Sequence, residues 1–494
     1  MIIDFRAGTG NVPRSGRCWT MADLRHWADL AGIDLTLVES MDARLHADEG
    51  PHEQLLAACR ASQGRFLPLM TIRLESDRVS IQRASSARAR GFAGVVLHGT
   101  LWEESLTVHA VLEALGQAPL PVYRELAYEE MDRAFRIASS HPRIAFVFAP
   151  SGFQGFELNH RLCTLPNVYL AMAHTLVSVG QLETACRLMG ADHILFAGDQ
   201  PQQHPARPVG LVHDADITAD QRALVLGGSA SRLLAAHGIN VPAPATAAKP
   251  RPPLPCPIFD THGHIGSDYR RPDFDSSVDA VLRYLERAGG DVICVSSTEA
   301  VFGDVIDGNR CVENAMRAHP DRIRGYLVIN PWMREACLND IRGARARGFS
   351  GLKPYPSTFG HQLSDDIMDP IWDLAAELDL PILCHSRAED LARVLARRPH
   401  TKMLAAHMSF EYAQKARLAR DYHGVVLEIS GAGAGPQDIL DALEIAGPDK
   451  LVFGSDLNNH VLGYTLQPLL CSGLEPGILK AVLRENALRF FGLR

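Results

Sequence analysis

Two histidines one residue apart could form part of a metal site: His262 and His264, in the segment FDTHGHIG. On an extended strand, side chains two residues apart point to the same face, so both imidazoles could bind one ion. Gly263 leaves room between them. A His-x-His pair is common, and taken alone it is weak evidence, so its weight depends on what else the fold brings near it.

Three further polar residues each end an otherwise apolar run: His385, His407 and Asp456. Each of them could simply cap a strand. If the runs are parallel strands of one barrel, however, their carboxyl ends meet at one rim, where barrel enzymes place their catalytic groups. Four imidazoles and a carboxylate at that rim are a ligand set suited to Zn²⁺ or Mn²⁺. The sequence therefore predicts a divalent metal site.

Eight short apolar runs carry these side chains in the second half of the chain. They alternate with segments that are apolar at helical spacing, and Ser276 or Ser277 is placed to cap the first such helix. Strands that alternate with helices form parallel sheets, and eight such units close a barrel. The eight runs span residues 258–262, 291–296, 323–329, 350–355, 381–385, 402–407, 424–429 and 450–456.

The first half of the chain repeats this order of signals more faintly. Its apolar runs span residues 1–5, 34–38, 66–70, 93–97, 120–124, 143–148, 167–172 and 193–197. The local matches between the halves are collinear: Asp4 with Asp260, 91–96 with 348–353, 120–125 with 380–385, and Asp199 with Asp456. Such an internal repeat indicates a repeated structural unit. The sequence thus predicts an α/β fold of two tandem (β/α)₈ barrels.

A proline-rich stretch divides the two halves. Residues 242–257 contain seven prolines in sixteen positions, which favours an extended spacer over regular structure. We expect a first barrel over residues 1–240, a linker over 241–256 and a second barrel over 257–494. The length of 494 residues agrees with this division, because one such barrel typically takes ~250 residues.

Composition and charge exclude several classes of protein. Hydrophobic residues make up 46% of the chain and charged residues 21%, which excludes disorder, collagen and coiled coil. A net charge of −8 argues against a nucleic-acid partner. The ten cysteines form no CxxC pair, and no apolar run reaches the ~20 residues that cross a bilayer. We therefore expect a cytoplasmic protein without a membrane partner that acts on a small molecule.

Several motifs of the second half resemble the amidohydrolase superfamily. They are DTHGH at 260–264, GLKP at 351–354, PILCH at 381–385, AHM at 406–408, FGSD at 453–456 and NALRFFGL at 486–493. The most similar branch is the amidohydrolase-related metal-dependent hydrolases, which includes enzymes like aminocarboxymuconate-semialdehyde decarboxylase. The resemblance covers nearly all of residues 257–494. It implies a distorted (β/α)₈ barrel with one or two divalent metals, usually zinc or manganese, at its mouth.

Residue by residue, the resemblance assigns roles to the polar strand ends. It implies that His262, His264, His385 and Asp456 bind the metal. It also implies that His407 polarises the attacking water or the substrate. Asp456 is in addition placed to take the proton of that water and return it to the leaving group.

Lys353 is the residue that decides between one metal and two. A lysine that points into a barrel is costly to bury as an ammonium, so it needs an acidic partner, a substrate anion or carboxylation. In some members of the superfamily this position is carboxylated and two metals bind. A single metal is more usual in the most similar branch, so we expect one ion per chain, with Zn²⁺ favoured over Mn²⁺.

The remaining candidates have less specific signals. Asp260, two residues before His262, either orients an imidazole or makes a hydrogen bond at the barrel floor. We interpret Glu428, near the end of the seventh run, as a buried structural carboxylate. Four residues in loops at the rim are expected to contact substrate: Arg387, Tyr355, Asn458 and His460.

The first half of the chain lacks most of this set. In the alignment of the repeats, Arg6 replaces His262, Gly8 replaces His264, Val96 replaces Lys353 and Glu125 replaces His385, and only Asp199 persists. One carboxylate cannot hold a catalytic divalent ion against water. We therefore interpret the first barrel as a pseudo-enzyme, and we expect it to pack on the second barrel as a pseudo-dimer.

The function that these residues favour is metal-dependent hydrolysis. Water activated at the mouth of the second barrel would cleave a C–N or C–O bond of a small amide, lactone or ester. Metal-dependent non-oxidative decarboxylation of a small carboxylic acid is the alternative. A non-catalytic binding protein is a third possibility, because one half has lost its chemistry.

Overall fold

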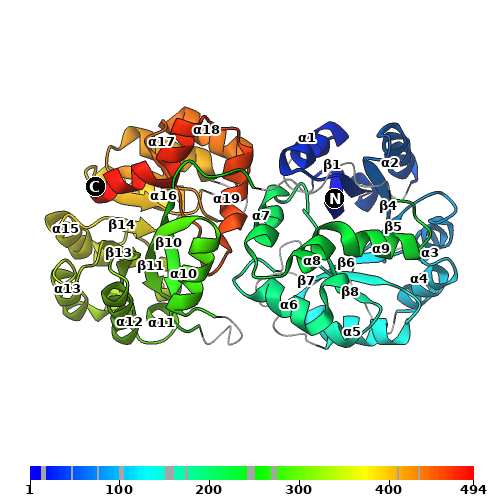
Figure 1. Ribbon diagram of the computed structural model, residues 1–494, viewed down its shortest axis with the longest axis horizontal. Helices are drawn as coiled ribbons and strands as arrows, with labels where there is room; N and C mark the ends of the chain where they lie inside the picture. Colours follow the sequence, from blue (N-terminus) through cyan, green and yellow to red (C-terminus); the bar gives the residue numbers. More distant parts are fainter. Residues whose placement is uncertain are drawn as a thin grey trace. The chain divides into compact units, whose positions relative to one another are not determined.

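The chain forms two compact α/β units, Met1–Arg251 and Pro252–Arg494. A computed structural model describes residues 1–12, 18–45, 48–74, 77–99, 105–150, 161–172, 176–241, 251–268, 275–408, 411–431 and 434–493 (Figure 1). Most of the expected linker, residues 242–250, lies outside this described part. We call the two units the N-terminal and the C-terminal barrel and describe each by itself.

The C-terminal barrel contains eight parallel strands that pair in sequence order. They are β10 (Ile258–Ile265), β11 (Gly290–Ser297), β12 (Ile323–Ile329), β13 (Gly351–Pro354), β14 (Ile382–Cys384), β15 (Met403–Ala405), β16 (Val425–Glu428) and β17 (Leu451–Val452). Backbone hydrogen bonds from Thr261 to Phe453 (3.0 Å) and from Asp456 to His262 (2.8 Å) join the last strand to the first. The eight predicted runs are thus confirmed as strands of a closed barrel.

Helices follow these strands and surround them (Figure 1). They are α10 (Val278–Arg287), α11 (Thr298–Phe302), α12 (Val305–Ala318), α13 (Glu335–Arg342), α14 (Pro356–Phe359), α15 (Asp369–Glu377), α16 (Ala388–Arg397), α17 (Tyr412–Asp421), α18 (Pro436–Ala446), α19 (Leu462–Cys471), α20 (Pro476–Lys480) and α21 (Asn486–Phe491). Ser277 caps α10, because its side chain accepts from the backbone N–H of Ala280. Phe259, Tyr326 and Leu383 pack with Ala487 of α21 in one apolar core cluster. The polar residues at the carboxyl ends of the strands therefore lie at the end of the barrel opposite this cluster.

The N-terminal barrel has the same strand order and one additional strand. Its strands are β1 (Ile3–Asn11), β2 (Cys18–Trp19), β3 (Leu35–Ser40), β4 (Phe66–Arg73), β5 (Gly94–His98), β6 (Val122–Leu126), β7 (Phe146–Pro150), β8 (Val168–Ala171) and β9 (Ile194–Leu195). The added β2 is antiparallel to β1 and was not predicted. Hydrogen bonds from Phe5 to Phe196 (2.9 Å) and from Gly8 to Gln200 (2.8 Å) close the sheet.

The last helices of this barrel are shorter than the first ones. They are α1 (Met21–Ala31), α2 (Gly50–Ala61), α3 (Asp77–Ser86), α4 (Leu106–Gln117), α5 (Met131–Ser140), α6 (Gln181–Met189), α7 (Ala206–Asp214), α8 (Ala219–Ala223) and α9 (Ser229–Ala236). Among the helices that the structure describes in either unit, none is long and apolar enough to cross a membrane.

Fine details of the backbone recur in the two units. A π-helical turn occurs at Leu224–Gly228 and again at Ala481–Glu485. The second residue of each turn accepts a backbone hydrogen bond from the end of the last strand, from Phe196 (3.1 Å) in one unit and from Phe453 (2.9 Å) in the other. Because sequence similarity between the halves is faint, this shared geometry strengthens the prediction of two tandem barrels.

Candidate metal centre

The predicted ligands converge on one cavity of about 290 Å³ in the C-terminal barrel. The cavity lies where the strands end, as expected for a barrel enzyme. Residues of β10 and β13 line it together with residues that follow β14, β15 and β17. The predicted site residues that line it are His262, His264, Lys353, Tyr355, His385, His407 and Asp456.

Three of these residues form a compact group of potential ligands: His262, His264 and Asp456. Asp456 Oδ1 lies 2.8 Å from His264 Nε2 and 3.7 Å from His262 Nε2. All three residues are buried. Two ligand atoms bound ~2.1 Å from one ion lie about 3 Å from each other, so this spacing fits a shared ion. Nitrogen and oxygen donors of this kind fit the divalent metal that the sequence predicts.

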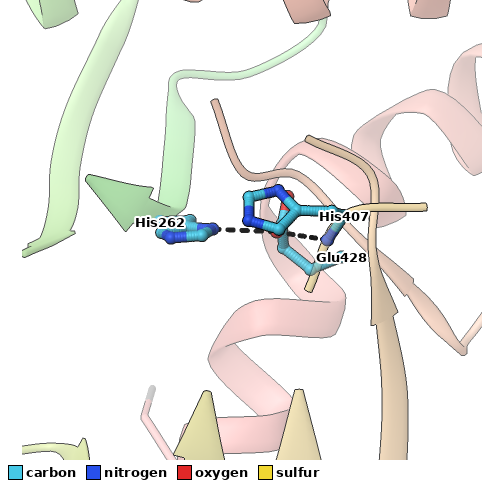
Figure 2. A group of neighbouring side chains, drawn as sticks. All are labelled: His262, His407 and Glu428. Atoms are coloured by element: carbon cyan, nitrogen blue, oxygen red, sulfur yellow. Dashed lines mark hydrogen bonds and ion pairs between the residues drawn. The ribbon is translucent and has the colours of Figure 1, made fainter. Parts of the chain in front are cut away.

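Glu428 fixes the ring of His262 in the orientation that a metal ligand needs. Its Oε2 lies 3.0 Å from His262 Nδ1, so Nδ1 carries the ring proton and donates a hydrogen bond to the carboxylate. The lone pair of Nε2 is then left to face the cavity. Glu428 also accepts from the backbone N–H of His407 (3.3 Å) and from the hydroxyl of Ser430 (2.8 Å). Figure 2 shows Glu428 lying between His262 and His407.

Glu428 also belongs to a second compact group with His262 and His407 that could hold an ion. Glu428 does not line the cavity, however, whereas the three members of the first group all do. It faces the Nδ1 side of His262, away from the nitrogen that approaches Asp456. The first group is therefore the better candidate for the ion, and Glu428 makes an orienting contact to His262.

His264 is held by a similar contact on its other side. Its Nδ1 lies 3.0 Å from Ser296 Oγ, which in turn lies 3.0 Å from the hydroxyl of Tyr355. The Tyr355 hydroxyl is itself 3.3 Å from His264 Nδ1. These contacts orient Nε2 of His264 toward Asp456. Sequence analysis did not find Ser296 or the orienting contact of Glu428, because a place near the end of an apolar run does not show which histidine ring a side chain contacts.

The imidazole and the carboxylate of this group are both in the protonation state that binds a cation. Burial, reinforced by the Lys353 charge, holds the pKa of His262 well below its ordinary value, so the ring is neutral. Burial opposes ionisation of Asp456, but hydrogen bonds with His264 and His460 outweigh it and hold that pKa well below its ordinary value. Asp456 is therefore a carboxylate, and a neutral imidazole and a carboxylate are the forms that bind metal.

Lys353 lies inside this group. It is fully buried, and its Nζ lies 3.0 Å from His262 Nε2. Burial lowers its pKa to about 8, although Asp456 and Glu428 oppose that shift. A buried amine with a lowered pKa is suited to hold an anion and is also more reactive than an exposed lysine.

His385 and His407 form a pair beside the compact group. His407 Nε2 lies 3.1 Å from His385 Nδ1, and His407 Nδ1 lies 2.9 Å from Ser430 Oγ. Among the described residues, His385 belongs to neither compact ligand group. His407 and Asp456 both have left-handed backbone conformations, with φ of 60° and 62°. Non-glycine residues rarely adopt such conformations, and they are typical of functional sites.

Asp260 contacts backbone rather than an imidazole. Its carboxylate accepts from the N–H of His262 (3.1 Å) and from the N–H of Ser455 (2.9 Å). His262 lies in the first strand of the barrel, and Ser455 lies in the segment that follows the last strand. Of the two roles left open by the sequence, the structure favours the structural one, because Asp260 joins the strands where the barrel closes.

The predicted substrate residues are distributed unevenly. Tyr355 lines the cavity. Asn458 is buried and does not line it, and His460 lies 3.4 Å from Asp456 Oδ2 and stacks on Tyr464. Asn459, which sequence analysis passed over, lines the cavity and donates to Asp456 Oδ1 (3.1 Å).

A larger cavity of about 790 Å³ adjoins the first. The two share Ser357, His385 and His407 in their linings. Arg387 lines the larger cavity and bonds to Glu411 (3.1 Å). His361 also lines it, and both of its ring nitrogens are buried without a hydrogen-bond partner among the described residues. The larger cavity therefore adds space next to the metal cavity, with charged and polar side chains among its lining residues.

Residues 260–493 match the protein-family model described as Amidohydrolase. The C-terminal barrel therefore belongs to the amidohydrolase family and is a metal-dependent enzyme of that superfamily. The matched segment contains every residue of the compact ligand group, so the family and the geometry agree on a divalent metal site. No curated protein matches the chain.

Solved structures of similar fold each cover about half of this chain. A 2,6-dihydroxybenzoate decarboxylase from Rhizobium is 13% identical over 48% of this chain and 99% of its own, with a TM-score of 0.41. A dihydroxybenzoic acid decarboxylase from Polaromonas sp. JS666, with bound manganese and an inhibitor, is 15% identical over 48% and 97%, with a TM-score of 0.41. A probable 2-pyrone-4,6-dicarboxylic acid hydrolase from Acinetobacter baumannii, with citric acid bound, is 17% identical over 48% and 99%, with a TM-score of 0.39.

Proposed function

We propose that the C-terminal barrel is a metal-dependent hydrolase that cleaves a C–N or C–O bond of a small amide, lactone or ester. The observation that carries this proposal is the position of Asp456, an ionised carboxylate within 2.8 Å of His264 and on the wall of the cavity. A carboxylate in that position can take a proton from an attacking water and return it to a leaving group.

A divalent ion held by His262, His264 and Asp456 would supply the Lewis acidity that makes water a nucleophile near neutral pH. The protein's own residues provide the rest. Asp456 accepts the proton, and His407, on the same cavity wall, can donate a hydrogen bond to the oxyanion that develops on the substrate when its proton is on Nε2 and Ser430 donates to Nδ1. Tyr355 and Asn459 line the cavity and position the substrate.

The metal that fits best is a single Zn²⁺, since two imidazoles and one carboxylate are a common catalytic zinc set. Mn²⁺ is the second choice, because it accepts the same nitrogen and oxygen donors. Elemental analysis of the purified protein should find about one ion per chain. His262→Ala should lose most of it, whereas a variant of the exposed His423 should keep it; equal metal content in both would contradict the site.

Lys353 tests whether one or two metals bind. An uncarboxylated lysine leaves the intact mass unchanged and accompanies one metal per chain, which is the outcome we expect. A mass increase of ~44 Da together with two metals would show that Lys353 is carboxylated and bridges them. Both quantities should be measured on the same sample under native conditions.

Decarboxylation remains the second candidate because of Lys353. A buried amine 3.0 Å from His262 could hold a substrate carboxylate in the metal cavity. The metal-loaded protein should be screened against lactones, N-acyl amino acids and aromatic carboxylates. Hydrolysis releases acid or amine without gas, while release of CO₂ would favour the second candidate.

The variant Asp456→Asn tests whether Asp456 is the base in hydrolysis. The amide fills the same space but cannot accept a proton, so hydrolysis should fall by at least 10³-fold if Asp456 is the base. Metal content must be measured alongside, because Asp456 is also a proposed ligand. Activity within tenfold of the parent protein, at equal metal content, would rule out the proton-transfer role.

A further inference from the structure

The N-terminal barrel contains an arginine at the strand position of a metal ligand. Arg6 follows Asp4 by two residues, as His262 follows Asp260. Both aspartates are fully buried, and each accepts a hydrogen bond of 3.1 Å from the backbone N–H of the residue two positions later. Arg6 and His262 therefore occupy equivalent places on the first strands of their barrels.

Three carboxylates surround the guanidinium of Arg6, which is itself fully buried. Its Nη2 lies 3.0 Å from Glu39 Oε1 and 3.3 Å from Glu125 Oε1. Its Nη1 bonds to Asp199 Oδ1. The guanidinium thus makes the contacts to acidic side chains that an ion would make in a metal site.

Two of these carboxylates stand at positions that correspond to predicted metal ligands of the other barrel. Asp199 corresponds to Asp456, and both have left-handed backbones, with φ of 50° and 62°. Glu125 corresponds to His385 in the aligned repeats. The ligand position of the last strand is therefore retained, and that of β6 has become acidic.

The strand register shows which residue of the C-terminal barrel corresponds to the third carboxylate, Glu39. Glu39 pairs with Gly8 between β1 and β3, and Ser296 pairs with His264 between β10 and β11. Glu39 therefore stands where the C-terminal barrel has Ser296. A side chain at Gly8 would have its Cβ 2.9 Å from the side chain of Met41, so the space next to Glu39 does not readily admit a histidine.

We propose that the guanidinium of Arg6 is a built-in replacement for the metal ion. It occupies the mouth of the N-terminal barrel, forms ion pairs with Glu39, Glu125 and Asp199, and excludes a divalent cation from them. Without the guanidinium, these three carboxylates form an oxygen-ligand site for a hard divalent cation such as Mn²⁺.

Glu39 is held in place independently of Arg6. It bonds to Arg44, and its Oε2 lies 2.9 Å from His98 Nε2 and 3.4 Å from the hydroxyl of Thr71. Burial opposes its ionisation, but Arg44 and His98, with Arg6, hold its pKa well below the ordinary value. The carboxylate thus stays oriented and charged when Arg6 is replaced, which a cation site requires.

The test counts Mn²⁺ bound to the full chain by electron paramagnetic resonance. His262→Ala serves as the background, because it removes the site of the C-terminal barrel. Adding Arg6→Ala to this background should produce one new Mn²⁺ site, bound at least tenfold more tightly than any Mn²⁺ on the background protein. Arg6→Lys keeps a positive charge and should produce none.

Two further variants test whether the new Mn²⁺ site uses the carboxylates around Arg6. Adding Glu125→Gln to Arg6→Ala should weaken the new site at least tenfold, because one of its three carboxylates is lost. If Arg6→Ala does not fold, Arg6→Gln, which keeps hydrogen-bond donors without the charge, takes its place. A folded, uncharged Arg6 variant that binds no additional Mn²⁺ would overturn the proposal, as would a new site that Glu125→Gln leaves unchanged.

Discussion

The two ring nitrogens of His262 have different roles: Nδ1 donates a hydrogen bond to Glu428, and Nε2 faces the cavity. A neutral imidazole carries one proton, and the partner that receives this proton decides which nitrogen is free to bind a metal. Glu428 accepts a hydrogen bond of 3.0 Å from the N–H of Nδ1, so the lone pair of Nε2 is left for the cavity. A single carboxylate on β16 thereby controls a ligand that lies 166 residues earlier in the chain.

Glu428→Gln should weaken metal binding by about 10–100-fold, the usual cost of losing a partner that orients a ligand. The amide loses the negative charge that makes the His262 ring a strong donor, and it places an N–H₂ group where the carboxylate accepted hydrogen bonds. Competition with a chelator of known affinity measures the change. Glu444→Gln, on the exposed face of α18, is the matched control. Equal affinity in both variants would contradict the orienting role.

The sequence predicted the candidate metal ligands but not the residues that orient them. His262, His264 and Asp456 were predictable because each lies at a strand end and barrel closure brings strand ends together. The contacts of Glu428 and Ser296 depend on side-chain length and on the curvature of the sheet. Neither quantity can be read from spacing along the chain. Asn459, rather than Asn458, reaches the cavity for the same reason.

At the scale of elements, each barrel closes through a buried aspartate on its first strand. Asp260 accepts from the N–H groups of His262 and Ser455, and Asp4 accepts from those of Arg6 and Gly198 (3.1 and 2.7 Å). Both contacts link the first strand to the segment after the last. The pattern is present whether or not the barrel has a metal site, which indicates a structural role.

Asp260→Asn should therefore destabilise the C-terminal barrel by about 1–3 kcal/mol, the cost of leaving buried donors without an acceptor. Both backbone N–H groups donate to Oδ1, which the amide keeps, but its N–H₂ group replaces Oδ2, which accepts from the Ser455 hydroxyl. Asp4→Asn should have the same effect on the N-terminal barrel. Chemical denaturation with a probe in each unit measures both. An unchanged midpoint in either variant would show that these hydrogen bonds do not stabilise the closure.

For the whole molecule, the division into two barrels was predictable from the repeat, because collinear matches over half the chain constrain the fold strongly. All sixteen predicted runs correspond to strands, whereas the two-residue strand β2 was missed. A pair of residues has no periodicity to detect, and β2 forms only because β1 extends far enough to pair with it.

Removing the metal should lower the thermal stability of the C-terminal barrel only. A bound ion stabilises the fold that binds it, by about 3 kcal/mol when its free concentration is 100 times Kd. Chelation should therefore lower the unfolding temperature of the C-terminal barrel and leave that of the N-terminal barrel, where Arg6 replaces the ion, unchanged. Calorimetry with and without chelator distinguishes the two transitions. A shift of both by the same amount would contradict the division of roles.

We propose that the N-terminal barrel serves as a permanent pseudo-subunit, since fusing two barrels in one chain raises their effective concentration. Each unit has apolar clusters of its own, around Val95 and Val147 in one and Phe259 in the other. Residues 252–494 made alone should therefore fold, but they should self-associate and lose activity, because the apolar face that we propose the N-terminal barrel covers would be exposed. Sedimentation and metal-loaded assays, with residues 1–251 added back, provide the test. A monomeric, fully active fragment would refute the role.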